Sequence, residues 1–179
     1  MTELTRYEME GLLIEHEKAE LEYDIAATMA TLVPNPSFEL CFMGLAVSGW
    51  DAVREMYSRM LTRGGEARNL QADARVVMAG SNHLVREALI SFDDDDGERR
   101  TGLYNVVVEF DPELKKIKGE RMYGDLTYGR FMSKIVGEDI ANVPGVTPIS
   151  TSLPIIEVHD AFAAAAARGI TINNPRVKL

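Results

Sequence analysis

An arginine, a tyrosine and an aspartate alternate near the end of the last long strand that the sequence predicts. Residues 121–125 follow a period of two, so Arg121, Tyr123 and Asp125 share one face. An apolar pocket disfavours a charged carboxylate, which raises its pKa and allows proton exchange near neutral pH. Asp125 is therefore the candidate general acid or base, Arg121 could tune it, and Tyr123 could contact the substrate. Two alternatives stay open: Asp125 pairs with Arg121, or it caps the turn to Thr127.

His16 is the second candidate, because it falls on the apolar stripe of an amphipathic helix. Leu12, Leu13 and Ala19 surround it on the helical wheel, and Tyr23 lies near it. A neutral imidazole there could be a base or donate to a substrate oxygen, and Tyr23 could reach the same space. The alternative is a core histidine satisfied by a carboxylate or a backbone carbonyl.

Asp24 has two roles open to it. It can contact a substrate together with the neighbouring Tyr23. It can also act as an N-cap, because Ile25, Met29 and Leu32 follow it at helical spacing. We prefer the cap, which predicts either a kinked helix or two helices in tandem.

The elements that must position these residues are helices first and antiparallel strands afterwards, an α+β arrangement. Helical spacing predicts helices over 5–32, a third helix between Ser48 and Gly64, and a short one over 128–136. A period of two predicts strands over 69–79, 83–92, 100–110 and 116–126, after a short strand over 37–43. The main domain is expected to span residues 1–136.

Residues 137–179 are predicted to form a C-terminal tail. The prolines within 142–153 predict an extended segment, and the alanine-rich stretch 157–168, closed by Gly169, predicts a helix. This tail is too small for a core of its own, so we expect it to pack on the main domain or on a partner subunit.

Metal and cofactor motifs are absent from the sequence. The four aspartates 93–96 lack the spacers and the distant glutamate of a calcium loop, so they predict an exposed hairpin tip. Cys41 in an apolar strand is expected to be a small core residue. There is no glycine-rich phosphate loop and no Gly-x-Ser-x-Gly elbow. No metal and no cofactor are expected.

The order of elements, together with four motifs, resembles the nuclear transport factor 2-like superfamily, in its SnoaL-like or ketosteroid-isomerase-like branch. The motifs are Asp24–Leu32, Gly49–Arg54, Val76–Val85 and Glu120–Asp125, and the resemblance covers roughly residues 5–134. It implies a curved sheet that folds around the helices as a cone-shaped roll with a cavity, and often a homodimer through the outer sheet face. The superfamily contains isomerases, dehydratases, cyclases, hydrolases and noncatalytic members, so the fold alone gives no function.

The resemblance also implies a set of site residues. In SnoaL-like cyclases the position matching Asp125 faces the cavity as general acid or base, and some dehydratases use a tyrosine and an aspartate near Tyr23 and Asp24. The apolar and aromatic side chains expected to line the cavity include Trp50, Met29 and Met56.

Three departures from the superfamily's enzymes limit this analogy. Residues 40–44 lack the carboxylate base of the steroid isomerases, and residues 69–79 lack the histidine of the dehydratases. The epoxide-hydrolase members use an arginine and two carboxylates on strands. The residues that could supply that set are Arg86, Glu87, Glu109, Arg121 and Asp125.

Composition limits the partners. A net charge of −9 repels phosphate backbones and anionic membranes, so neither nucleic acid nor a membrane is expected as a partner. Residues 1–10 contain three glutamates and no apolar run, unlike a secretory signal. A single cysteine excludes an intramolecular disulfide. We expect a cytoplasmic protein.

The sequence predicts an enzyme that performs cofactor-independent acid–base chemistry, of the cyclase, dehydratase or isomerase kind, on a small and mainly apolar molecule. Asp125 would exchange the proton, and His16 and Tyr23 would orient the substrate or stabilise developing negative charge. The alternative is a noncatalytic ligand-binding or subunit-association module of the same fold.

Overall fold

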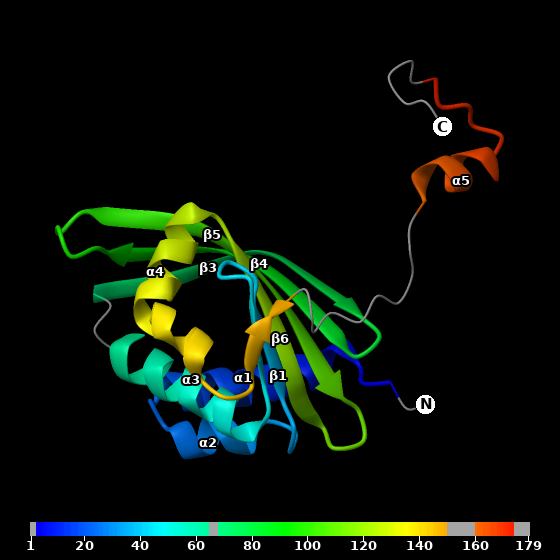
Figure 1. Cartoon of the computed structure of the whole chain (residues 1–179). Helices are drawn as coiled ribbons and strands as arrows, with labels where there is room; N and C mark the ends of the chain where they lie inside the picture. The colour runs from blue at the N-terminus through cyan, green and yellow to red at the C-terminus, as the bar shows by residue number, and fades with distance from the viewer. Residues whose placement is uncertain (1–2, 65–67, 150–159, 174–179) are drawn as a thin grey trace.

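Seven strands form one mixed sheet, in the order β3-β4-β5-β6-β1-β2-β7, in a computed structural model that describes residues 3–64, 68–149 and 160–173. Figure 1 shows the sheet curving around the helices. The strands are β1 (Ser37–Leu40), β2 (Leu45–Ser48), β3 (Arg68–Gly80), β4 (His83–Asp93), β5 (Arg99–Asp111), β6 (Lys116–Gly124) and β7 (Val146–Pro148). All neighbours pair antiparallel except β1 and β6, which are parallel.

The helices are α1 (Arg6–Leu21), α2 (Ile25–Ala30), α3 (Trp50–Gly64), α4 (Leu126–Val136) and α5 (Ala161–Ala166), with a 3-10 helix η1 (Glu138–Asn142). Four α-helices, α1, α2, α4 and α5, begin at side chains that satisfy their first free N–H groups. Thr5 and Glu8 form a capping box at α1. The caps of α2, α4 and α5 are Asp24, Asp125 and Asp160. The predicted N-cap role of Asp24 is confirmed, and α1 and α2 are separate helices.

The inner face of the sheet is identified by its register. Val106 and Val108 of β5 pair with Met122 and Glu120 of β6, and both valines and Met122 are core residues. Because side chains alternate, Arg121 and Tyr123 lie on the outer face. The expectation that these two residues face the interior is therefore wrong.

A bulge in β6 explains this reversal. Phe110 of β5 pairs with Ile117 of β6, and the preceding residue of β5, Glu109, pairs with Gly119. Lys118, between Ile117 and Gly119, is therefore an extra residue without a partner on β5. On β6 the side chain of the odd-numbered Ile117 points inward before the bulge. After the bulge the even-numbered side chains point inward. Gly119 also passes so close to Ser37 of β1 that a Cβ atom would stand 1.6 Å from the Ser37 carbonyl oxygen.

The core joins the inner face of the sheet to α1, α3 and α4. The short strands β2 and β7 were not predicted separately. Strand β2 pairs with β1 as a hairpin, and β7, from the predicted tail, adds to its edge. Helix α5 lies apart from the sheet in Figure 1 and buries none of its residues. Residues 157–159 of the helix predicted there lie outside the described part.

Candidate functional site

Asp125 lies just beyond the end of β6 and caps α4. Its carboxylate accepts hydrogen bonds from the backbone N–H groups of Tyr128, at 2.9 Å, and Leu103, at 3.0 Å. Partial burial would raise the pKa of Asp125, but the N–H groups of Tyr128, Leu103 and Thr127 outweigh it and lower the pKa. The raised pKa expected for this residue is therefore wrong, and the alternative role as a cap is confirmed. A catalytic role for Asp125 stays a prediction.

Arg121 and Tyr123 belong to a separate group of side chains on the outer face. Arg121 lies 3.6 Å from the carboxylate of Glu39 and 3.8 Å from that of Glu109. Tyr123 is 44% exposed. Neither side chain shares a site with His16, which lies on the other side of the sheet.

Tyr23 also lies away from His16. Helix α1 ends at Leu21, and Tyr23 takes a positive φ of 55°, so the helical wheel does not extend to it. Its side chain is 58% exposed, so the expectation that it reaches the interior is wrong. The carboxylate of Asp24 accepts from Ala27 N–H at 2.9 Å as a cap.

The three expected lining residues divide between the surface and the core. Trp50 begins α3 and is 40% exposed. Met29 and Met56 are fully packed core residues. Their roles in substrate binding stay predictions.

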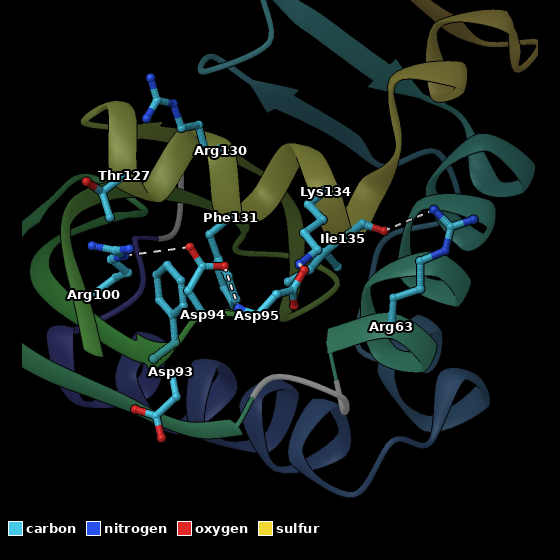
Figure 2. A pocket seen from close by; sticks show the side chains of 11 residues that line it. Arg63, Asp93, Asp94, Asp95, Arg100, Thr127, Arg130, Phe131, Lys134 and Ile135 are labelled. Carbon is cyan, nitrogen blue, oxygen red and sulfur yellow. Dashed lines mark hydrogen bonds and ion pairs between the residues drawn. The ribbon is translucent and has the colours of Figure 1, made fainter. Parts of the chain in front are cut away.

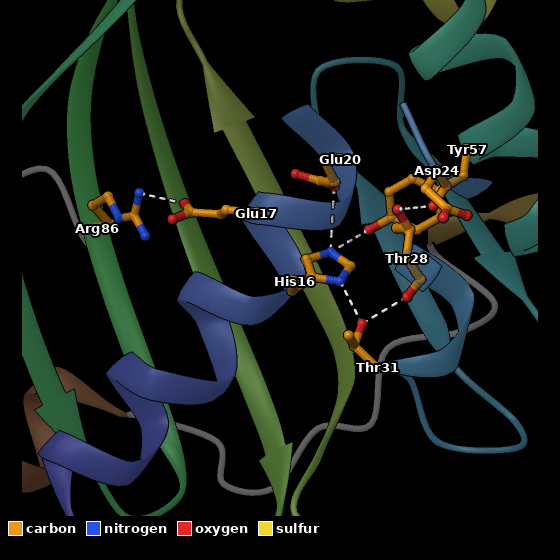
Figure 3. A network of polar contacts seen from close by, with 8 residues as sticks. All are labelled: His16, Glu17, Glu20, Asp24, Thr28, Thr31, Tyr57 and Arg86. Atoms are coloured by element: carbon orange, nitrogen blue, oxygen red, sulfur yellow. Dashed lines mark hydrogen bonds and ion pairs between the residues drawn. The ribbon is translucent and has the colours of Figure 1, made fainter. Parts of the chain in front are cut away.

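His16 of α1 is the predicted site residue that lies on the helix side of the sheet, and both nitrogens of its ring have polar partners (Figure 3). The hydroxyl of Thr31 donates to the Thr28 carbonyl at 2.6 Å, so it can only accept from His16 Nδ1–H, also at 2.6 Å. In the neutral ring Nε2 is then the acceptor, and the Tyr57 hydroxyl donates to it at 2.9 Å.

The same ring nitrogen faces a carboxylate. Glu20 lies 3.3 Å from Nε2 and accepts from it when His16 is protonated. Burial lowers the pKa of His16, but Glu20, with Glu120 and Glu17, has the larger effect and raises it. His16 and Tyr57 are fully buried, so they can position Glu20 but cannot touch a substrate.

Glu120 is the residue that sequence reasoning missed. It stands on the inner face of β6 between buried residues, yet it retains some accessible surface. Its carboxylate forms no hydrogen bond or ion pair with any described residue. Its charge acts on residues of five elements, namely His16 (α1), Tyr57 (α3), Arg86 (β4), Tyr104 (β5) and Tyr128 (α4). Glu120 is therefore central to the space between the helices and the sheet.

The environment of Glu120 brings its pKa to about 7 from an ordinary 4.5. Burial is the largest cause, because it disfavours the charged form. His16 and Arg86 act in the opposite direction, and Glu20 and Glu17 raise the pKa further. A carboxyl group with this pKa is half protonated at neutral pH and can both take and give a proton.

Arg86 and Tyr104 complete this inner cluster, which we define as His16, Glu17, Glu20, Tyr57, Arg86, Tyr104 and Glu120. Arg86 donates to Glu17 at 2.6 Å, as Figure 3 shows. Burial is the main cause that raises the pKa of Tyr104. Its hydroxyl therefore stays protonated and can donate a hydrogen bond.

Two hollows lie outside this cluster. The larger, of about 900 Å³, is bordered by α4, the β4–β5 hairpin and Arg63 of α3 (Figure 2). Many of its charged groups are already paired, Arg100 with Asp94 and Lys134 with Asp95. A smaller hollow of about 610 Å³ includes Asp125.

Two negative findings hold for the described residues. None of their His, Cys, Asp and Glu side chains form a group of three or more that could hold a metal ion. None of the helices in this part of the chain is long and apolar enough to cross a membrane.

Comparison with known proteins identifies the fold. No family model and no curated protein sequence matches the chain. Among solved structures, a steroid delta-isomerase from Pseudomonas aeruginosa superposes with a TM-score of 0.57 at 14% identity, over 79% of this chain and 97% of that one. A SnoaL-like polyketide cyclase from Shewanella denitrificans gives 0.54 at 12% identity, over 70% and 97%.

A third match has no assigned activity. An NTF2-like protein of unknown function from Cytophaga hutchinsonii gives a TM-score of 0.52 at 19% identity, over 65% of this chain and 99% of that one. At these identities the matches show a shared fold and nothing finer, and that fold is the NTF2-like one expected from the sequence.

Proposed function

We propose that this chain of NTF2-like fold is a small-molecule enzyme that uses cofactor-independent acid–base chemistry, with Glu120 as the proton-transfer group. One observation carries the proposal: the Glu120 carboxylate, to which none of the described residues hydrogen-bonds, stands inside the curved sheet, and burial raises its pKa to about 7. Strongly shifted carboxylates with a physical cause are markers of functional sites. The acid–base step of a lyase or isomerase, of the cyclase or isomerase kind, needs a group that can take and give a proton at neutral pH.

The roles of the neighbours follow from their exposure and protonation. Glu120 would accept a proton from a substrate C–H or O–H and return it to another atom of the intermediate. The Tyr104 hydroxyl would donate to the oxygen on which negative charge develops. His16 and Tyr57 are positioning residues, because they hold Glu20 and contact no accessible space.

The walls beside Glu120 favour a mainly apolar substrate. Val108 lies directly opposite Glu120 on β5, Leu84 of β4 pairs with Val108, and Met122 is the next inward position on β6; all three are apolar and buried. An apolar wall also keeps the pKa of Glu120 high, because it offers the charged form no compensating donor.

Base-catalysed ring opening of 5-nitrobenzisoxazole tests this proposal without knowledge of the natural substrate. The reaction removes one C–H proton, breaks the N–O bond and releases a coloured phenolate. We expect a rate that rises with pH through about 7, and a loss of about 100-fold or more in Glu120→Gln. Glu113→Gln, in an exposed turn, is the matched control.

An unchanged rate in Glu120→Gln would overturn the assignment. The noncatalytic alternative has one observation in its favour, since His16 and Tyr57 are buried and hydrogen-bonded as in a structural core network. A protein without base-catalysed activity, but with a small-molecule ligand inside the sheet, would support that alternative.

A further inference from the structure

The hollow between α4 and the β4–β5 hairpin is large enough to hold a small molecule (Figure 2). Its volume of about 900 Å³ lies within the range of known small-molecule sites. None of the described residues that line it belongs to the inner cluster. A ligand bound here would therefore be independent of the function proposed for Glu120.

One wall of this hollow is aromatic and apolar. Phe92 of β4 is buried and stacks on Phe131 of α4, with ring centroids 4.2 Å apart. Ile135 follows Phe131 by four residues, so both lie on the same face of α4, and both line the hollow. Phe131 is only half-buried. A ring that is covered on one side can take a flat apolar body against its other side.

The charged side chains around this wall have a positive excess, although the whole chain carries a net charge of −9. The charged lining residues are Arg63, Arg100, Arg130 and Lys134, together with Asp93, Asp94 and Asp95. Four cations and three carboxylates leave an excess of one positive charge. The hollow therefore attracts an anion with a single charge.

The three aspartates already have cationic partners. The ion pairs are Asp93 with Arg99, Asp94 with Arg100 and Asp95 with Lys134. Arg130 is exposed and makes no hydrogen bond or ion pair with another described residue. Arg63 donates to the Ile135 carbonyl, at 3.4 Å, and to no described carboxylate. These two arginines are thus the cations of the hollow that are left for a ligand.

We propose that this hollow binds a small aromatic carboxylate, whose charged group lies on the Arg130 guanidinium and whose ring lies on Phe131. Arg130 precedes Phe131 in α4, and it can turn toward a ligand without breaking a contact. A planar guanidinium donates two parallel hydrogen bonds to a carboxylate, which fixes its orientation. Arg63, which stands apart from Arg130 in Figure 2, adds positive potential.

Other classes of ligand fit this hollow less well. A cation would meet an excess of positive charge, and it would find each aspartate already paired. A phosphate dianion would bring more negative charge than the excess of one can balance. A neutral aromatic molecule would use the apolar wall alone and would gain nothing from Arg130.

Titration calorimetry at neutral pH and low salt tests the proposal with three probes of the same shape. The probes are 2-naphthoate, 2-naphthalenemethanol and 2-naphthylmethylammonium. We expect 2-naphthoate to bind about tenfold more tightly than the alcohol, because it adds charge-assisted hydrogen bonds. The ammonium compound should bind most weakly. Added salt should weaken the binding of 2-naphthoate, because salt screens the attraction.

Three substitutions locate the site, with one matched control. Arg130→Gln should weaken 2-naphthoate about tenfold and leave the alcohol unchanged, while Arg63→Gln, which acts at a distance, should weaken 2-naphthoate about twofold. Asp95→Asn should tighten the binding of 2-naphthoate about twofold, because the rim loses one negative charge. Arg54→Gln is the control, since Arg54 is an exposed arginine of α3 that does not line the hollow.

Three results would overturn the proposal: the ammonium compound binds as tightly as 2-naphthoate, no probe binds, or Arg130→Gln binds 2-naphthoate like the wild type. An equal loss in Arg54→Gln and Arg130→Gln would overturn it too, because the attraction would then not depend on the position of the arginine. Circular dichroism would verify that every variant is folded.

Discussion

Replacement of Glu120 by glutamine should make the protein more stable at high pH, although it removes the proposed catalytic group. Glutamine has nearly the shape of protonated glutamic acid and never becomes charged. Above pH 7 the wild-type carboxylate loses its proton in a buried position, where no described residue offers it a hydrogen bond.

The size of the effect follows from the pKa of Glu120. One pKa unit corresponds to about 1.36 kcal/mol, so a rise from 4.5 to about 7 costs about 3 kcal/mol at most. Between these values the folded state binds more protons than the unfolded state. The stability contribution of Glu120 therefore decreases as pH rises from 4.5 to 7, and is constant above and below that window.

Urea unfolding of the wild type and Glu120→Gln at pH 4.5 and pH 8 measures this difference. We expect near-equal unfolding free energies at pH 4.5, and a variant more stable by up to about 3 kcal/mol at pH 8. In a chain of this length, that gain corresponds to a melting temperature higher by about 6–12 °C. Glu113→Gln should show no such dependence on pH.

A variant that is less stable than the wild type at pH 8 would refute the reasoning. So would a difference that is the same at both pH values, because it would then come from packing or hydrogen bonding and not from ionisation. Either outcome would mean that the carboxylate of Glu120 has a partner in solution.

Two further predictions concern the frame around the site. Gly119→Ala should destabilise the fold by about 3 kcal/mol or more, since its Cβ would meet the Ser37 carbonyl oxygen at 1.6 Å. Urea unfolding measures this loss. Gly11→Ala is the control, because its Cβ would lie in open space, and it should stabilise the fold by up to about 1 kcal/mol. Asp125→Ala should lower the free energy of unfolding by about 1–2 kcal/mol, because α4 loses its N-cap. Asp125→Asn, which keeps a capping side chain, should keep the ring-opening rate. If that rate is lost, the base is Asp125 and not Glu120.

The sequence predicted most elements because their signals are local. Asp24 is followed by apolar residues at helical spacing, and the structure has a cap there. The long strands have a clear period of two and simple hairpin connections. The strands β2 and β7 were missed because four and three residues, respectively, are too few to show a period. The equally short β1 was predicted from its apolar and aromatic residues, not from a period.

The site was harder to predict because its position depends on one extra residue. Without a bulge, alternation from Ile117 places Arg121 on the inner face. The extra residue at Lys118 reverses the alternation and places Glu120 there instead. The hydrophobic pattern contains a trace of this, since Ile117 and Met122 are five residues apart and cannot share a face of a regular strand. That spacing could have identified the bulge.

Stability and chemistry at Glu120 have one physical cause. The apolar walls that disfavour its charged form reduce stability above pH 7, and they also keep a carboxylate basic enough to remove a proton at neutral pH. Glu120→Gln should therefore combine higher stability at pH 8 with lost base catalysis. A purely structural glutamate would predict the opposite combination, in which a destabilising substitution leaves proton transfer unchanged.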